Sequence, residues 1–355
     1  MLSQKQYIKY LTLAISLFLL YHIVMWTFFT SKIFGLDDKH SIGDLARMSY
    51  QVDMLYKREL QYTLTKSFLY RDIYDNKPVD IITIGDSFSH GGGGGKNPYY
   101  QDYLATLYNQ RVLNIDPQDA YDFFETVVGL YKSGFLEKTH PKFLILQSVE
   151  RFFPRRFSQN LKISHYKAVE AIISEKTFHL RHLDVPFIST ANYKLPYYSF
   201  LYLFKENAKK DIHKVHLTQD FFTQNIDDKM LFLDEDTKNI PQFTQQSIQK
   251  MNSNFNIIAQ LLKKLNITLI VFPTPDKYDL YSLYIKENKH PQNPFYKLIR
   301  PLQKEYIFID SKKILAKKLK EGTLDLYYPD DTHWSYKASK TIISNSIFKD
   351  LFSKQ

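Results

Sequence analysis

The longest apolar stretch of the chain runs from Leu11 to Phe29 and contains no Asp, Glu, Lys or Arg. As an α-helix it would measure roughly 28 Å, close to the hydrocarbon thickness of a bilayer. Lys5 and Lys9 precede it, so the positive-inside rule places the N-terminus in the cytoplasm and the rest of the chain outside. Thr30-Ser31-Lys32 offers no small-x-small cleavage site. We therefore expect residues 1–30 to be an uncleaved membrane anchor, with a buried core helix as the alternative.

From residue 78 onward, short apolar runs alternate with segments of helical spacing. Continuous apolar runs of this length are typical of strands buried on both faces, and their alternation with helices predicts a three-layer, doubly wound parallel α/β sheet. The expected strands are residues 79–84, 111–115, 143–149, 267–272 and 306–309, and the expected helices are 98–110, 120–133, 245–265, 314–320 and 335–351.

Two regions lack this alternation of apolar runs and helical segments. Residues 31–77 are mixed and charged, so we interpret them as a stalk or linker in which 41–69 form an amphipathic helix, either as the stalk or as a cover for the domain. Residues 152–240 are rich in Phe, Tyr, Lys and His. They are interpreted as a partly helical insertion, either a docking or acceptor groove or a lid, within a main domain at 78–355.

Composition narrows the function only slightly. The chain has 355 residues, a net charge of +10 and no cysteine, which excludes a cysteine nucleophile, thiolate metal sites and disulfides. A basic chain can bind anionic lipid or an acidic polymer, but no basic cluster lies in a recognisable nucleic-acid module, so no nucleic-acid partner is expected. The pairs His179/His182 and His213/His216 lack an evident third ligand. Accordingly, no metal and no cofactor are expected.

A serine follows the first apolar run of the domain, in Gly85-Asp86-Ser87-Phe88-Ser89. Parallel strands carry their ligand-binding loops at their C-terminal ends, and a serine on such a turn can expose its hydroxyl. The alternative is a simple strand-ending turn.

A histidine lies close behind carboxylates near the C-terminus, in Asp330-Asp331-Thr332-His333-Trp334. An imidazole can accept the proton of a serine, while a carboxylate on its other nitrogen orients the ring. Asp330 and Asp331 are both close enough to His333 in the sequence to orient its ring. The alternative is that the aspartates cap the final helix.

Together the two motifs resemble the SGNH (GDSL-type) hydrolase superfamily, in which the serine of an early Gly-Asp-Ser block is served by Asp and His from a late block. The tetrapeptide Asp331-Thr332-His333-Trp334 is similar to the polysaccharide O-acetyltransferase branch represented by the periplasmic alginate acetylation proteins. Two further stretches look similar to that branch: Ser148-Val149-Glu150-Arg151 and Pro273-Thr274-Pro275-Asp276-Lys277-Tyr278.

The resemblance implies Ser87 as the nucleophile, His333 as the base and Asp331 as the acid that orients it. Asp330 is the alternative acid, because the wider superfamily uses an Asp three residues before the His. Two departures stand out. The serine block precedes the histidine block here, unlike in the alginate proteins, and the loops at 114–118 and 148–151 lack the glycine and asparagine of the usual oxyanion hole. The replacement donors are the Ser87 amide together with Arg151 or an amide of the run Gly91 to Gly95, although Arg151 can instead pair with Glu150 or a surface acid.

As function, the resemblance implies a membrane-anchored, periplasm-facing O-acetyltransferase of the inner membrane. It would carry acetyl groups on Ser87 to a cell-envelope or exported polysaccharide, with a multi-spanning membrane acyltransferase (MBOAT type) as donor. The alternatives are a carbohydrate acetyl esterase and a non-catalytic scaffold or polymer-binding subunit. Near the serine, we interpret the run Gly91 to Gly95 as a slack surface loop, with a flexible rim that orders around substrate as the alternative. His90 is close to Ser87 in sequence, but this does not orient it toward the hydroxyl, so it is not our candidate for the base.

Overall fold

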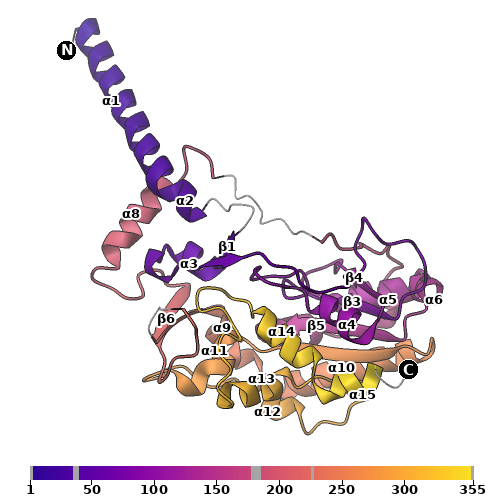
Figure 1. Cartoon of the computed structure of the whole chain (residues 1–355). Coiled ribbons are helices and arrows are strands. Elements are labelled where there is room, and N and C mark those ends of the chain that lie inside the picture. Colours follow the sequence, from indigo (N-terminus) through magenta and orange to yellow (C-terminus); the bar gives the residue numbers. More distant parts are fainter. Residues whose placement is uncertain (1–2, 35–39, 177–184, 225–227, 353–355) are drawn as a thin grey trace.

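A five-stranded parallel sheet forms the centre of the chain in the computed structural model, which describes residues 3–34, 40–176, 185–224 and 228–352 (Figure 1). The strand order is β4-β3-β5-β8-β9. The strands are β3 (Ile81–Ile84), β4 (Val112–Ile115), β5 (Phe143–Val149), β8 (Thr268–Thr274) and β9 (Ile307–Phe308). The chain moves from β3 outward to β4 and then returns to the other side of β3 as β5. The switch point of the sheet therefore lies at β3, where doubly wound folds place their ligands.

Helices cover both faces of this sheet, which confirms the predicted three-layer α/β architecture. One face packs against α4 (Tyr100–Tyr108), α13 (Ser311–Lys320), α14 (Tyr336–Ile343) and α15 (Ser346–Phe352). The other packs against α5 (Phe123–Lys132), α6 (Phe135–Thr139), α7 (Phe153–Phe157), α10 (Gln245–Lys263) and α12 (Phe295–Ile299). The closing helix expected at 335–351 is split in two, because Asn345 accepts a hydrogen bond from the amide of Ile347 and so starts a new helix.

The N-terminal helix extends away from this domain (Figure 1). It comprises α1 (Gln4–Met25), a π-helical turn η1 (Trp26–Thr30) and α2 (Ser31–Phe34). Among the described residues, Gln4–Phe34 is the one helix long and apolar enough to cross a membrane, with a mean hydropathy of 1.9. Most of its apolar side chains are exposed. A buried core helix, the alternative considered for this stretch, does not fit that exposure.

The amphipathic helix expected over residues 41–69 is wrong. The segment forms only short elements: β1 (His40–Ile42), α3 (Asp44–Ser49), the 3₁₀ turn η2 (Val52–Met54) and β2 (Lys57–Glu59), which pairs antiparallel with β1. Its backbone and charged groups find their partners in the 330–331 loop instead of within a helix: the amide of Ala46 donates to the carbonyl of Asp330 at 3.1 Å. Tertiary contacts therefore override the helical spacing.

The insertion is partly helical, as expected, but it also contains a second small sheet. The 3₁₀ turn η4 (Ile163–His165), α8 (Ala191–Leu201), α9 (Glu235–Lys238) and η5 (Ile240–Gln242) provide its other turns and helices. The antiparallel pair β6 (Ile212–His216) and β7 (Lys229–Leu233) was not predicted. The amide of Leu231 in β7 donates to the carbonyl of Pro329, so this pair supports the loop that carries His333. Downstream, α11 (Lys277–Tyr281) and η6 (Ser282–Tyr284) follow β8.

Candidate active site

Ser87 lies on the turn directly after β3, at the switch point of the sheet, and its side chain is exposed. The turn is tight enough to require Gly85. A Cβ atom there would lie 2.0 Å from the Ser89 hydroxyl and 2.4 Å from the Gln147 amide oxygen, distances that no side chain tolerates. The turn therefore places Ser87 at the surface while Gly85, Phe88 and Ser89 are buried.

Asp86 anchors the turn and does not face the histidine. Its carboxylate accepts the amides of Phe88 and Val149 at 3.2 and 2.7 Å and pairs with Arg156 at 2.6 Å. Burial alone would raise the pKa of Asp86, but the Arg156 charge and these hydrogen bonds hold it below its usual value. Asp86 thus fixes the turn against β5 and keeps its own charge neutralised.

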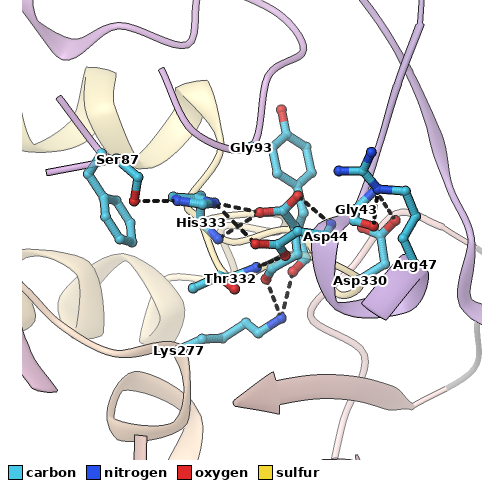
Figure 2. Close-up of polar contacts among 12 residues, drawn as sticks. Gly43, Asp44, Arg47, Ser87, Gly93, Lys277, Asp330, Thr332 and His333 are labelled. Carbon is cyan, nitrogen blue, oxygen red and sulfur yellow. Dashed lines mark hydrogen bonds and ion pairs between the residues drawn. The ribbon is translucent and has the colours of Figure 1, made fainter. Parts of the chain in front are cut away.

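The structure brings Ser87, His333 and Asp331 together, and Figure 2 shows Ser87 pointing toward the His333 ring. His333 Nε2 is 2.7 Å from Ser87 Oγ, and His333 Nδ1 is 2.8 Å from Asp331 Oδ1. A carboxylate can only accept a hydrogen bond, so Nδ1 carries the proton and Nε2 is left as the acceptor that faces the serine. This tautomer is the one that a general base for a serine nucleophile requires.

The two adjacent aspartates have different partners. Asp330 points away from the imidazole: it pairs with the buried Arg58 and accepts the amides of Gly43 and Tyr56 at 3.1 Å each. Asp331 Oδ1 faces both the ring and the backbone amide of His333, the latter at 2.9 Å. Of the two acids considered, the geometry thus gives the position behind the imidazole to Asp331.

Two residues of the N-terminal segment complete the surroundings, and no motif in the sequence could have identified them. Asp44 Oδ1 accepts the amide of Thr332 at 2.7 Å, and Asp44 Oδ2 lies 3.8 Å from His333 Nδ1. Arg58 lies 3.4 Å from Asp331 and donates to the carbonyl of Gly93 at 3.2 Å. Residues 40–61 therefore contribute charge directly to the candidate site.

Lys277 supports the histidine loop from below (Figure 2). Its buried ammonium donates to the carbonyls of Tyr328, Pro329 and Asp331 at 3.0, 3.2 and 2.6 Å. Burial lowers the pKa of Lys277 to about 8, against the opposing charges of Asp331 and Asp330. Lysine is rarely buried without partners, and these three carbonyls satisfy the ammonium of Lys277.

The charges of this cluster tune the histidine. Burial alone would lower the pKa of His333, but its hydrogen bond to Asp331 and the charges of Asp331 and Asp44 raise it above the ordinary value. Burial would likewise raise the pKa of Asp331, yet His333 and Arg58 hold it far below its usual range. Burial and the nearby Asp331 charge raise the pKa of Asp44. The ring is therefore a stronger base than a free imidazole, with an ionised carboxylate behind it.

The glycine run is not the slack loop that we expected. A Cβ atom at Gly92 would lie 2.4 Å from the His333 ring, and the Gly92 amide donates to the Ser87 carbonyl at 2.8 Å. Gly93 has a φ of +86°, and a Cβ atom added there would lie 3.0 Å from the His333 Cβ, so both features favour glycine. The run is therefore the wall against which the imidazole packs.

Two other candidate residues lie elsewhere. Arg151 is buried in ion pairs with Asp276 at 2.6 Å and Asp236 at 3.3 Å, so its described contacts are those of an arginine paired with acids and not those of a donor to Ser87. His90 bonds to Asp116 at 2.9 Å. Burying Arg151 together with its acids ties the ends of β5 and β8 to the insertion.

Carboxylate and imidazole groups that could hold a metal ion gather in the site itself. Ligand atoms of Asp44, Asp331 and His333 lie within 4.8 Å of one another, but the two last are already bonded to each other. His213 bonds to Asp234, and His216 bonds to Asp228 and Glu206. The other pair, His179/His182, lies outside the described residues. The donor set therefore suits proton transfer better than metal binding.

Comparison with known proteins agrees with this architecture. Residues 226–342 match the family model described as the SGNH hydrolase-like domain of the acetyltransferase AlgX. The match includes Asp331 and His333, while β3 and Ser87 lie outside it. No curated protein matches the chain. The match spans less than half of the chain; it confirms the resemblance to the SGNH superfamily and supports the likeness to the AlgX-type acetyltransferase branch.

Proposed function

We propose that this chain is a membrane-anchored O-acetyltransferase that carries an acetyl group on Ser87 and passes it to a hydroxyl of a cell-envelope or exported polysaccharide. The observation that carries the proposal is the hydrogen-bonded series Ser87–His333–Asp331, with distances of 2.7 and 2.8 Å. The AlgX-type match supports the acetyl group, and the apolar helix supports the anchor.

The reaction has two balanced halves. Ser87 Oγ attacks the acetyl carbonyl as its proton moves to His333 Nε2, and His333 returns that proton to the departing group, which leaves an acetyl-serine. A sugar hydroxyl then attacks the acetyl carbon while His333 accepts its proton, and the same proton restores the Ser87 hydroxyl. Asp331 stays ionised throughout and stabilises the imidazolium. The backbone amide of Ser87 is the proposed oxyanion donor on this turn.

The donor must reach Ser87 from the membrane side. We propose an inner-membrane location with the N-terminus cytoplasmic and the domain periplasmic, because Lys5 and Lys9 flank the inner end of the apolar stretch. A multi-spanning membrane acyltransferase of the MBOAT type would supply the acetyl group to Ser87.

The test is acetylation of the purified full-length chain by an activated acetyl ester. Mass spectrometry of peptides is expected to find one acetyl group on Ser87, and to find none in Ser87→Ala. Ser253→Ala, which changes an exposed serine on α10, should behave as wild type. Full polymer acetylation in cells that carry Ser87→Ala would refute the catalytic role and leave a non-catalytic scaffold or polymer-binding subunit.

One observation favours a second function, a carbohydrate acetyl esterase. The Ser87 side chain is exposed, so water can reach an acetyl-serine. The two functions differ in their acceptor. Added oligosaccharide should gain acetyl groups at the expense of acetate release if the chain is a transferase, and should leave acetate release unchanged if it is an esterase.

A further inference from the structure

Helix α8 (Ala191–Leu201) has an inner face that is firmly attached to the rest of the chain. Leu195 is buried, the ring of Tyr198 stacks on that of Tyr50 with 5.3 Å between centroids, and the hydroxyl of Tyr202 donates to the carbonyl of Ser49 at 2.7 Å. The partners Ser49 and Tyr50 are the last helical residue of α3 and its C-cap. The position of α8 against the domain is therefore fixed by packing and by a hydrogen bond.

The same helix is bonded to the apolar N-terminal helix, which it meets near the lower end of α1 (Figure 1). The two ring nitrogens of His22 bond to the Asn192 amide nitrogen at 2.6 Å and to the Tyr193 hydroxyl at 2.7 Å. Tyr21 donates to the Asn192 carbonyl at 2.6 Å, and Trp26 donates to the Val185 carbonyl at 2.9 Å. These bonds place the N-terminal end of α8 at the level of residues 21–26 of that helix.

The outer face of α8 and of the residues beside it is apolar and uncovered. Leu203 is 74% exposed and Phe204 72% exposed, which places them among the most exposed large apolar side chains of the described residues. The exposed large side chains of this patch are Ile188, Tyr197, Phe200, Leu203 and Phe204. Phe187 and Tyr193 are also exposed, but their rings contact those of His22 and so connect the patch to the N-terminal helix. Tyr197, Phe200 and Phe204 follow at spacings of three and four residues, and the rings of Phe200 and Phe204 lie 5.3 Å apart. Exposed apolar side chains gathered in this way mark a binding surface.

We propose that this patch, called the α8 patch below, lies in the outer interface of the lipid bilayer that α1 crosses. The proposal takes α1 as membrane-spanning and does not depend on the acetyl-transfer chemistry. From His22 to Phe29 the helix rises roughly 10 Å, so a bilayer that ends near Phe29 reaches down to α8. Interfacial helices bury their apolar face about 5–10 Å into the headgroup boundary, which is the same depth.

Charge and continuity favour lipid as the occupant. The patch adjoins the exposed apolar surface of α1 through the bonded residues 21–26, and Lys194, Lys205 and Lys210 around it are exposed. Aromatic rings and lysines are the side chains that interfaces of anionic bilayers select.

Membrane contact at α8 would also orient the candidate site. The N-terminal end of α3 carries Asp44, which contacts the His333 loop, while its C-terminal end contacts α8. A bilayer that holds α8 would therefore hold the catalytic loop at a fixed height and orientation relative to the membrane, as a reaction with a membrane-embedded donor needs.

The test uses the absence of cysteine from the chain. Single-cysteine variants Leu203→Cys and Phe204→Cys of the full-length protein are labelled with a polarity-sensitive fluorophore and reconstituted in vesicles of phosphatidylcholine and phosphatidylglycerol. Lipids with a spin label on the acyl chain then quench any label that lies in the bilayer. Leu17→Cys, in the middle of α1, is the control for spanning. Leu107→Cys is the control for exposure, because it is 46% exposed on α4, on the far side of the molecule (Figure 1).

We expect at least twofold quenching at positions 17, 203 and 204 and none at 107. Quenching at 17 without quenching at 203 and 204 would overturn the proposal and assign the α8 patch to a protein partner. Absence of quenching at 17 would overturn it as well, because α1 would not span. A second variant, Leu203→Glu with Phe204→Glu, should reduce energy transfer from a label at position 107 to fluorescent headgroups. Unchanged transfer would overturn the role of the patch in orienting the domain.

Discussion

At the scale of single residues, the neighbouring aspartates Asp330 and Asp331 differ in their partners: Asp331 contacts the His333 ring, whereas Asp330 pairs with the buried Arg58. We predict that Asp331→Asn lowers kcat by about 10⁴-fold with little change in KM, because the amide stabilises the wrong imidazole tautomer while leaving the geometry intact. The measurement is the steady-state hydrolysis of an activated acetyl ester by purified protein.

Asp330→Asn is the matched comparison and should act on stability. Removing this charge leaves the buried Arg58 without its main partner, and breaking such a buried pair costs about 3–5 kcal/mol. Urea unfolding should show this loss, while the folded fraction keeps most of its rate. If folded Asp330→Asn lost as much activity as Asp331→Asn, the assignment of the orienting acid to Asp331 would be wrong.

The charges around His333 predict the pH dependence of the reaction. The base must be neutral to accept the serine proton, so activity is lost as the pH falls through the pKa of His333. Burial would lower this pKa and the nearby Arg151 charge opposes protonation too, but Asp331 and Asp44 raise it overall. We therefore expect the acid limb of kcat/KM to lie above the ordinary histidine value of about 6.5.

A substitution of Asp44 should shift the acid limb of the kcat/KM profile. Asp44→Asn removes a negative charge 3.8 Å from His333 Nδ1, so the pKa of His333 falls and the acid limb shifts to lower pH. Asp53→Asn removes a half-exposed carboxylate that pairs with Lys214 and should leave the profile in place. An unshifted limb in Asp44→Asn would show that Asp44 acts on the loop and not on the ring.

At the scale of elements, the glycine run Gly91 to Gly95 is a structural wall of the site. We predict that Gly92→Ala lowers kcat by about 100-fold or more, because its Cβ would lie 2.4 Å from the His333 ring and must displace it. Gly322→Ala is the control, since a Cβ there meets nothing within 4 Å; its positive φ of +81° costs stability but not rate. Comparing kcat and the melting temperature of both variants separates the two effects.

Elements whose pattern is local were predictable from the sequence. The apolar run 143–149 became β5 with the expected bounds, and the Gly-Asp-Ser and Asp-Thr-His-Trp motifs led directly to Ser87 and His333. The segment 41–69 was not predictable, because its helical spacing is overridden by contacts with a loop almost 290 residues away. Asp44 and Arg58 were missed for the same reason: neither lies in a motif, and only the folded chain brings Asp44 to His333 and Arg58 to Asp331.

At the scale of the whole molecule, the site joins three distant parts of the chain. The turn after β3 supplies Ser87, the C-terminal loop supplies Asp331 and His333, and residues 40–61 supply the charges behind them. The sequence predicts a stalk at residues 31–77, and a stalk would be dispensable for chemistry. The contacts of residues 40–61 with the 330–333 loop predict instead that this part of the segment is needed for activity.

Truncation decides between these two boundaries. We predict that a chain of residues 40–355 in detergent forms acetyl-Ser87 at the rate of the full-length protein, because Asp44 and Arg58 are retained. A chain of residues 62–355 should form it at least 100-fold more slowly and unfold at lower urea concentration, since the buried Asp330 loses its cation and its amide donors from Gly43 and Tyr56. Mass spectrometry of the adduct over time measures the first effect. Arg58→Met within the 40–355 chain should reproduce most of the loss of stability; full acetylation of the 62–355 chain would instead show that the segment serves only as a stalk.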